Sequence, residues 1–310
     1  MQYEWINNVA KMSSDYTIIH FHENFNQGID PNTLPKKLTT LTFGWMFNQG
    51  IDPNTLPKNL TSITFGKHFN QKINPNTLPE NLTTLTFGQQ FTQKIEPNTL
   101  PENLTFLTFG NKFNQIIEPN TLPGNLTFLT FGKNFNQEID PNTLPKNLTT
   151  LVFGRDYNQK INPNTLPENL TTLIFGCYFN QKIEPNTLPE NLTTLTFGCY
   201  FNQKINSKML PYNLKNINFD WMCCNKHTIE MVNNIPSYYH VKILVINNIF
   251  IFGNDGIKWP IYVLDYNENK WSSNIYEIQD KYIHPIHGPI TVLINKETYQ
   301  SYSSAKSAIK

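Results

Sequence analysis

The stretch Phe69–Gly88, FNQKINPNTLPENLTTLTFG, decides the fold because the chain repeats it with few changes. The copies follow one another at a fixed period of 22 residues. A degenerate earlier copy is visible at Ile19 and Phe21, one period before Leu41 and Phe43. The array therefore runs from about residue 12 to about residue 222, and such a fixed period is the signature of a repeat architecture. The opening aromatic residues are Phe25, Phe47, Phe69, Phe91, Phe113, Phe135, Tyr157, Phe179 and Phe201.

Each copy predicts one coil of a solenoid. In the segment Leu82–Phe87, LTTLTF, the first, fourth and sixth residues are apolar with threonine between them, which suits a short strand with Leu85 and Phe87 pointing inward. Thr84 and Thr86 would then point outward. Pro97 and Pro101 exclude a helix on the return path, so that path should be extended or turn-like. A single coil leaves two apolar faces open, and stacking would bury them and pair the strands into a parallel sheet.

Asparagine recurs one position after the opening aromatic residue. Its side-chain amide could bond backbone groups left unpaired where the chain bends, so we predict a structural asparagine ladder, with the following glutamines in a similar role. The ladder positions are Asn26, Asn48, Asn70, Asn114, Asn136, Asn158, Asn180 and Asn202, with Thr92 as the exception.

The triplet Asn-Leu-Thr matches the glycosylation acceptor pattern in seven copies. The repeat carries the triplet along, and no secretory signal precedes it, so we expect these asparagines to remain without glycans. They are Asn59, Asn81, Asn103, Asn125, Asn147, Asn169 and Asn191.

Composition limits the classes of partner. The 310 residues carry a formal charge of +1, which argues against nucleic acid or anionic lipid as a partner. The N-terminus has no signal-peptide pattern, and no run reaches the ~18 apolar residues of a membrane helix. Four cysteines make no disulfide framework in a chain of this size. We expect a soluble protein of the cytoplasm, or of the host cell cytoplasm if the protein is viral.

The repeat resembles the FNIP repeat, which is grouped with the leucine-rich repeats. The resemblance rests on Phe69-Asn70-x-x-Ile73-x-Pro75, then Leu78-Pro79 and Leu82-x-x-Leu85-x-Phe87, and it covers about two thirds of the chain in register. Such proteins are typical of slime moulds and of large viruses that infect amoebae. The resemblance implies a solenoid for protein interaction and no enzymatic activity. Some relatives carry an F-box before the repeats, but here the array begins near Met12 and leaves no room for one.

Four consecutive copies depart from threonine at the outward strand positions. They carry Phe106, Phe128, Val152 and Ile174. In stacked coils these side chains would lie together on one face as an apolar patch, and such a patch commonly marks a contact site. Drift among nearly neutral outward positions is the alternative explanation.

The residues that follow each strand also vary between copies. They form an edge of the stack on which partner choice could depend, although such turns also vary for want of constraint. The candidate residues on this variable edge are Trp45, Met46, His68, Arg155, Tyr178 and Tyr200.

The C-terminal region breaks the period. The segment Val241–Ile246 resembles a final distorted coil, and Asn248–Phe252 with Trp259–Tyr266 predicts a hairpin. Pro289–Asn295 is a further predicted strand. We expect residues 1–222 to form the solenoid and residues 223–310 to form a small β-containing cap, with a separate partner-binding domain as the alternative.

No catalytic pattern stands out in the sequence. Cys223, Cys224 and His227 fit no standard zinc spacing, and a phosphate loop, a nucleophile elbow and an HExxH motif are all absent from the sequence. We therefore expect no cofactor, no metal and no enzyme. The predicted fold is a β-rich, leucine-rich-repeat-like solenoid with a parallel sheet on one face and a non-helical return.

The predicted function is a non-enzymatic scaffold for an unidentified protein partner. One alternative is a substrate-recruiting subunit of a ubiquitin ligase that lacks its own F-box. A more remote alternative is ice binding, because outward Thr-x-Thr pairs would repeat at ~4.8 Å between coils and ~6.7 Å along a strand. The four apolar residues interrupt that lattice at its centre.

Overall fold

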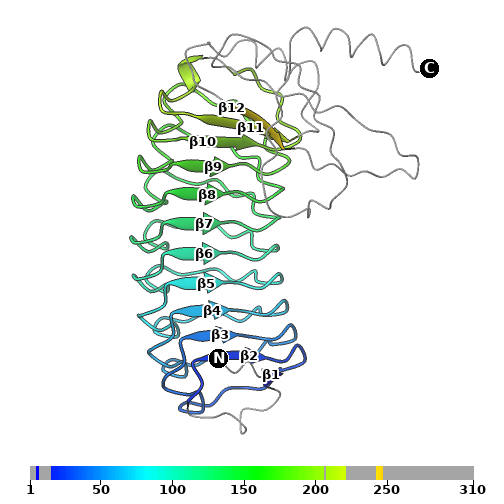
Figure 1. Ribbon diagram of the computed structural model, residues 1–310, viewed down its shortest axis with the longest axis vertical. Coiled ribbons are helices and arrows are strands. Elements are labelled where there is room, and N and C mark those ends of the chain that lie inside the picture. The colour runs from blue at the N-terminus through cyan, green and yellow to red at the C-terminus, as the bar shows by residue number, and fades with distance from the viewer. Residues whose placement is uncertain (1–4, 7–14, 206, 221–241, 247–310) are drawn as a thin grey trace, which may run out of the picture.

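The computed structural model describes residues 5–6, 15–205, 207–220 and 242–246, and the fold is given for these residues. Their twelve strands form one sheet whose order follows the chain (Figure 1). Every neighbouring pair is parallel. The strands are β1 Trp5–Ile6, β2 Ile18–Phe21, β3 Thr40–Thr42, β4 Ser62–Thr64, β5 Thr84–Thr86, β6 Phe106–Thr108, β7 Phe128–Thr130, β8 Thr150–Val152, β9 Thr172–Ile174, β10 Thr194–Phe197, β11 Asn216–Asp220 and β12 Lys242–Ile246.

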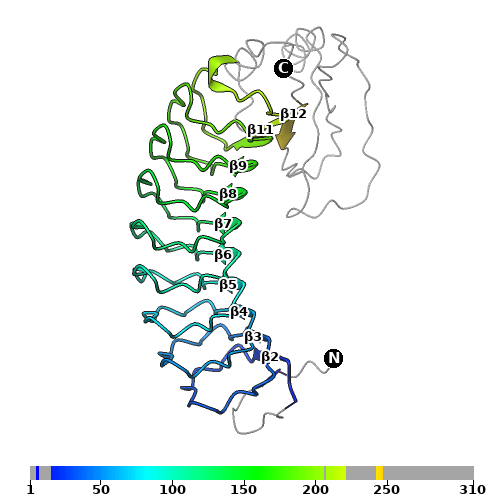
Figure 2. The ribbon, with the colours of Figure 1, turned by 90° about the vertical axis from the view of Figure 1, so that its left-hand side faces the viewer.

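The 22-residue period becomes the register of the sheet. Leu85 pairs with Leu107, and Leu107 pairs with Leu129, each one coil further along the stack. The middle residue of each short strand is buried and its two neighbours are half-buried or exposed, as the alternation of leucine and threonine predicted. The stack is curved, and the sheet lines its concave side (Figure 2).

Two columns of aromatic rings fill the core behind the sheet. Phe87, which follows its strand, stacks on Phe91 of the same coil at 4.0 Å between ring centroids. Each ring also stacks on its equivalent in the next coil, Phe87 on Phe109 at 5.7 Å and Phe91 on Phe113 at 6.1 Å. Such pairs stabilise by about 0.5–1.5 kcal/mol beyond the burial of their area. These contacts between coils stabilise a fold that one coil could not reach alone.

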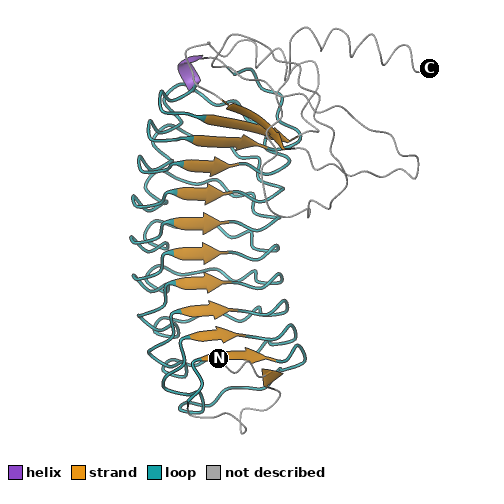
Figure 3. Cartoon of the chain, viewed as in Figure 1, coloured by secondary structure: helices purple, strands orange, loops and turns teal. Residues whose placement is uncertain are grey.

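The return path is built from turns, as the prolines predicted (Figure 3). The asparagine of each Pro-Asn-Thr segment has a positive φ, between 61° and 67°, and asparagine tolerates this left-handed conformation better than most residues. Among the described residues, the helical structure is the three-residue 3₁₀ turn η2, Ser207–Met209, and no helix is long and apolar enough to cross a membrane. The asparagines are Asn32, Asn54, Asn76, Asn98, Asn120, Asn142, Asn164 and Asn186.

The predicted asparagine ladder is confirmed. The Oδ1 of Asn48 accepts a hydrogen bond from the backbone N–H of Asn70 in the next coil at 2.8 Å, and Gln71 donates from Nε2 to the same oxygen at 3.2 Å. Equivalent bonds from Asn136 to Asn202 continue the ladder. The ladder thus satisfies backbone donors where the chain bends away from the core.

Both ends of the array extend beyond the perfect repeat. At the start, β1 pairs with β2, with Ile6 opposite Phe21, and the repeat pattern had not predicted this strand. At the other end, β12 pairs with β11, with Asn216 opposite Lys242, a separation of 26 residues where the array has 22. The segment expected to end the array, Val241–Ile246, therefore adds a strand to the sheet, and residues 221–241 lie outside the described residues. The predicted hairpin, the strand at Pro289–Asn295 and the cysteines at 223 and 224 lie outside the described residues.

Candidate interaction surface

The concave face of the sheet is covered by two rows of outward side chains. Each short strand contributes one residue to each row, on either side of its buried central residue. From β3 to β10 neither row contains an ionisable side chain, and most positions are threonine. The surface is therefore uncharged along most of the stack.

The four patch candidates interrupt these threonine rows as two adjacent pairs. Phe106 lies directly opposite Phe128 in the first row, with ring centroids 5.6 Å apart and the planes tilted by 33°. Val152 lies opposite Ile174 in the second row, in the next two coils. Phe128 and Val152 are in neighbouring strands and one row apart, which places them roughly 8 Å from each other. Phe106 is the most open of the four, with 49% of its surface exposed.

The edge candidates fall into two separate groups. The first lies beside β3 and β4, where the Nζ of Lys67 stands 5.1 Å from the centre of the Trp45 ring. Met46 and His68 are exposed next to them. This group ends two strands before the patch begins, since β5 lies between β4 and β6.

The second edge group lies beside β8, β9 and β10. Tyr178 and Tyr200 stack with ring centroids 5.1 Å apart, and the guanidinium carbon of Arg155 stands 5.3 Å from the centre of the Tyr178 ring. Arg155 also donates from Nε to Asp156 at 2.9 Å, and this hydrogen bond raises the pKa of its guanidinium. Both tyrosines remain well exposed, at 41% and 52%.

The patch and the second edge group are close to each other in the sequence. Arg155 comes three residues after Val152, and Tyr178 comes four residues after Ile174, at the end of the same strands. The patch and the edge were predicted separately from the sequence. The register shows that they occupy consecutive coils, from β6 at Phe106 to the coil of β10 at Tyr200.

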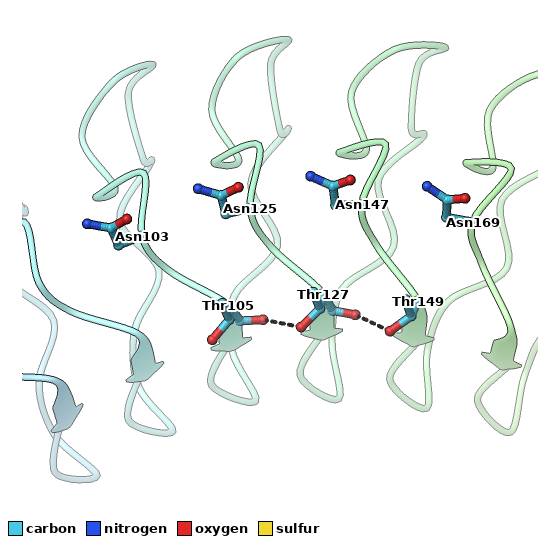
Figure 4. A pocket seen from close by; sticks show the side chains of 7 residues that line it. All are labelled: Asn103, Thr105, Asn125, Thr127, Asn147, Thr149 and Asn169. Carbon is cyan, nitrogen blue, oxygen red and sulfur yellow. Dashed lines mark hydrogen bonds between the residues drawn. The ribbon is translucent and has the colours of Figure 1, made fainter.

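A shallow groove of about 590 Å³ runs along the other margin of the sheet (Figure 4). The hydroxyl of Thr127 donates to the backbone oxygen of Thr105 at 3.1 Å, and Thr149 donates to Thr127 in the same way. The amide of Asn147 donates to the backbone oxygen of Gly124 at 2.9 Å. Since these donors are used inside the array, the groove presents mainly acceptor oxygens. Its residues are Asn103, Thr105, Asn125, Thr127, Asn147, Thr149 and Asn169.

The same contacts explain the repeated Asn-Leu-Thr triplet. Six of its asparagines use the amide nitrogen, the atom that a glycan would occupy, as a donor to the preceding coil. The triplet therefore has a structural role in the array.

Two exposed apolar residues were not among the candidates predicted from the sequence. Ile116 and Tyr212 are 59% and 81% exposed, and each replaces a charged residue at its position in the coil before, Lys94 and Glu190. An apolar side chain at a position that is charged in most other coils was the available signal. Within the described residues, no group of three His, Cys, Asp or Glu side chains is placed to hold a metal ion.

A stack of 22-residue coils with a parallel sheet on its concave side defines a solenoid of the leucine-rich-repeat type. The family model described as FNIP Repeat matches residues 16–45, 47–90, 69–112, 91–134, 113–151, 135–178 and 179–220. The chain belongs to the FNIP repeat family, as its repeat had indicated.

A similar solved structure is that of CroV588, described as a circular leucine-rich-repeat protein, which is from a giant virus. The two chains are 48% identical with a TM-score of 0.62, over 67% of this chain and 34% of CroV588. The match therefore spans about a third of the length of that protein. The pneumococcal vaccine antigen PcpA is 13% identical over 76% of this chain and 78% of its own, with a TM-score of 0.22. No match to a curated protein was found.

Proposed function

We propose that this chain is a non-enzymatic scaffold that binds a protein partner on the concave face of its sheet. The apolar patch, Phe106, Phe128, Val152 and Ile174, is the centre of the contact. The observation that supports it is the pair formed by Phe106, which is 49% exposed, and the half-buried Phe128, with rings 5.6 Å apart on a face covered mostly by threonine. Contiguous exposed apolar side chains commonly mark contact sites, and a few central ones carry most of the binding energy of an interface.

The curved stack suits such a role. A solenoid binds through the broad concave surface that its repeats create together, and here that surface has no charge to desolvate along the strands from β3 to β10. The membership of the FNIP repeat family supports an interaction scaffold as well.

The test is quantitative affinity purification of partners from the native cell with three forms of the chain. Phe106→Thr with Phe128→Thr restores the residue of the other coils and should remove the specific partner. The control, Ile116→Lys, removes an apolar side chain that is 59% exposed and lies outside the patch, and it should retain that partner. A partner list unchanged by the double substitution would show that the patch is not the binding surface.

A further inference from the structure

The margin of the concave face that follows the strands is basic beside the patch. Lys112, Lys133 and Arg155 follow β6, β7 and β8 in three successive coils. Lys112 and Lys133 are exposed, and neither forms an ion pair with any residue in the described part of the chain. Asp156 forms an ion pair with Arg155 and therefore balances the charge of that residue, but not the charges of the two lysines. Two lysines thus stand uncompensated next to an uncharged face.

The opposite margin carries no such excess. Beside the same three strands it has Glu102, Gly124 and Lys146, which sum to no net charge. Glu102 is further engaged, because its Oε1 accepts a hydrogen bond from the Gly124 N–H at 2.9 Å. The charge around the patch is therefore asymmetric, and a complementary partner would be acidic on one side only.

The apolar side chains cross the face obliquely. They begin with Phe106 and Phe128 in the first row, shift to Val152 and Ile174 in the second, and end at the stacked pair Tyr178 and Tyr200 on the basic margin. We call these six residues the diagonal stripe. It spans the coils of β6 to β10, four steps of ~4.8 Å, or about 19 Å along the stack.

The sheet offers a partner side chains and no free backbone. Every strand from β2 to β11 is paired on both sides, so a partner cannot bind there by adding a strand. A segment that satisfies its own main-chain hydrogen bonds suits such a face, and an α-helix does so. About 13 helical residues span 19 Å, with apolar side chains at every third or fourth position along the stripe.

We infer that the diagonal stripe binds an amphipathic α-helix whose apolar side is flanked by acidic residues facing Lys112 and Lys133. This inference rests on the proposed function and names the class of partner. The helix would follow the diagonal stripe obliquely along the stack, with its acidic flank toward the basic margin.

The test uses the full chain and synthetic 18-residue amphipathic peptides with a leucine stripe, with binding followed by fluorescence anisotropy. One peptide carries glutamate along one flank, a second carries lysine there, and a third is the acidic peptide with a central proline. We expect the acidic peptide to bind about threefold tighter or more than the basic one, since two exposed ion pairs differ. The proline peptide should bind at least tenfold more weakly, because proline breaks the helix.

Variants of the chain locate the site. Lys112→Glu with Lys133→Glu should remove the preference for the acidic peptide, whereas the matched control, Lys58→Glu with Lys146→Glu on the other margin, should preserve it. The control leaves hydrogen bonds to those lysines intact, because they end on backbone oxygens. Phe106→Thr with Phe128→Thr should remove binding of both helical peptides.

The outcomes separate this inference from the proposed function. Three results would overturn the inference of an acidic helix. The acidic and basic peptides could bind with equal affinity, or neither could bind. The preference for the acidic peptide could also persist in the variant Lys112→Glu with Lys133→Glu. Equal binding of the proline peptide would show an extended occupant and overturn it too. None of these results changes the native partner list obtained with the Phe106 and Phe128 variant, on which the proposed function depends.

Discussion

The backbone of Gly132 lies against the carbonyl group of Gly110, so closely that a Cβ on Gly132 would fall 1.9 Å from the Gly110 oxygen. Real Cβ atoms essentially never come within 3.0 Å of another heavy atom of this kind. Glycine is therefore required at this turn by the close approach of two coils, and no positive φ is involved. The same contact recurs at Gly66, Gly88, Gly110, Gly154, Gly176 and Gly198.

Gly132→Ala should destabilise the array by about 3 kcal/mol or more, because two backbones must separate to admit the methyl group. The matched control is Gly50→Ala, at an exposed glycine with no atom within 4 Å of the added Cβ. Gly50→Ala should change the free energy of unfolding by less than about 1 kcal/mol. The change should be stabilising, because alanine makes the unfolded chain less flexible. Urea unfolding followed by circular dichroism compares the two. Equal midpoints would contradict the close-approach explanation.

The asparagine ladder has one natural gap, which gives a stabilising prediction. Thr92 has no amide oxygen, and among the described residues no hydrogen bond is made by the backbone N–H of Asn114 in the next coil. Thr92→Asn should supply that acceptor and stabilise the array by about 0.5–1.5 kcal/mol. Asn48→Ala should have the opposite effect, since it removes the acceptor of the Asn70 N–H. Thermal unfolding of both variants tests the pair, and a destabilised Thr92→Asn would refute the ladder as a source of stability.

The sequence predicted the solenoid because each local signal agreed with the period. The inward Leu85 and Phe87, the turn-rich return and the ladder at Asn48 all follow from residue chemistry applied one coil at a time. The strand β1, Trp5–Ile6, was missed because two residues outside the period carry no such signal. The sequence did not predict why glycine is required after each strand, because the approach of Gly132 to Gly110 depends on the distance between coils.

The candidate surface was predictable as a set of residues and less so as an arrangement. The period alone placed Phe106 beside Phe128, since equivalent positions become neighbours in the sheet. The stacking of Tyr178 on Tyr200 and the position of Arg155 over Tyr178 depend on side-chain rotamers at a turn. A single sequence does not specify those rotamers.

Tyr157 is the one tyrosine among the opening aromatic residues, and its hydroxyl is buried with no hydrogen-bond partner in the described structure. Its ring stacks between Phe135 and Phe179 at 6.1 Å from each. Tyr157→Phe should therefore stabilise the array by about 1–3 kcal/mol, because an unsatisfied buried hydroxyl is removed without a change of ring shape. The reverse control, Phe135→Tyr, should destabilise it. Denaturant midpoints that move in the other direction would indicate a partner for the hydroxyl.

The same residue predicts a pH dependence. Burial raises the pKa of Tyr157 above its ordinary value of 10.0, so the folded chain keeps a proton that the unfolded chain releases. Stability from this residue is therefore complete below pH ~10 and is lost as the pH rises further. The advantage of Tyr157→Phe over the native chain should widen by about 1.4 kcal/mol per pH unit above that point. Unfolding at about pH 8 and about pH 11 measures it, and a constant difference would contradict the burial of an ionisable hydroxyl.

The patch substitutions should leave the fold intact, which decides whether a loss of binding can be interpreted. Phe106 is half exposed, and threonine is the residue at its position in most coils, so Phe106→Thr with Phe128→Thr should change the free energy of unfolding by less than about 1 kcal/mol. Leu107, between the two rows, is fully buried, and Leu107→Ala should cost about 2–5 kcal/mol. Urea unfolding of the three proteins separates these cases. If the double substitution were as destabilising as Leu107→Ala, the two phenylalanines would be part of the core. The proposal that the patch is a docking surface would then be wrong.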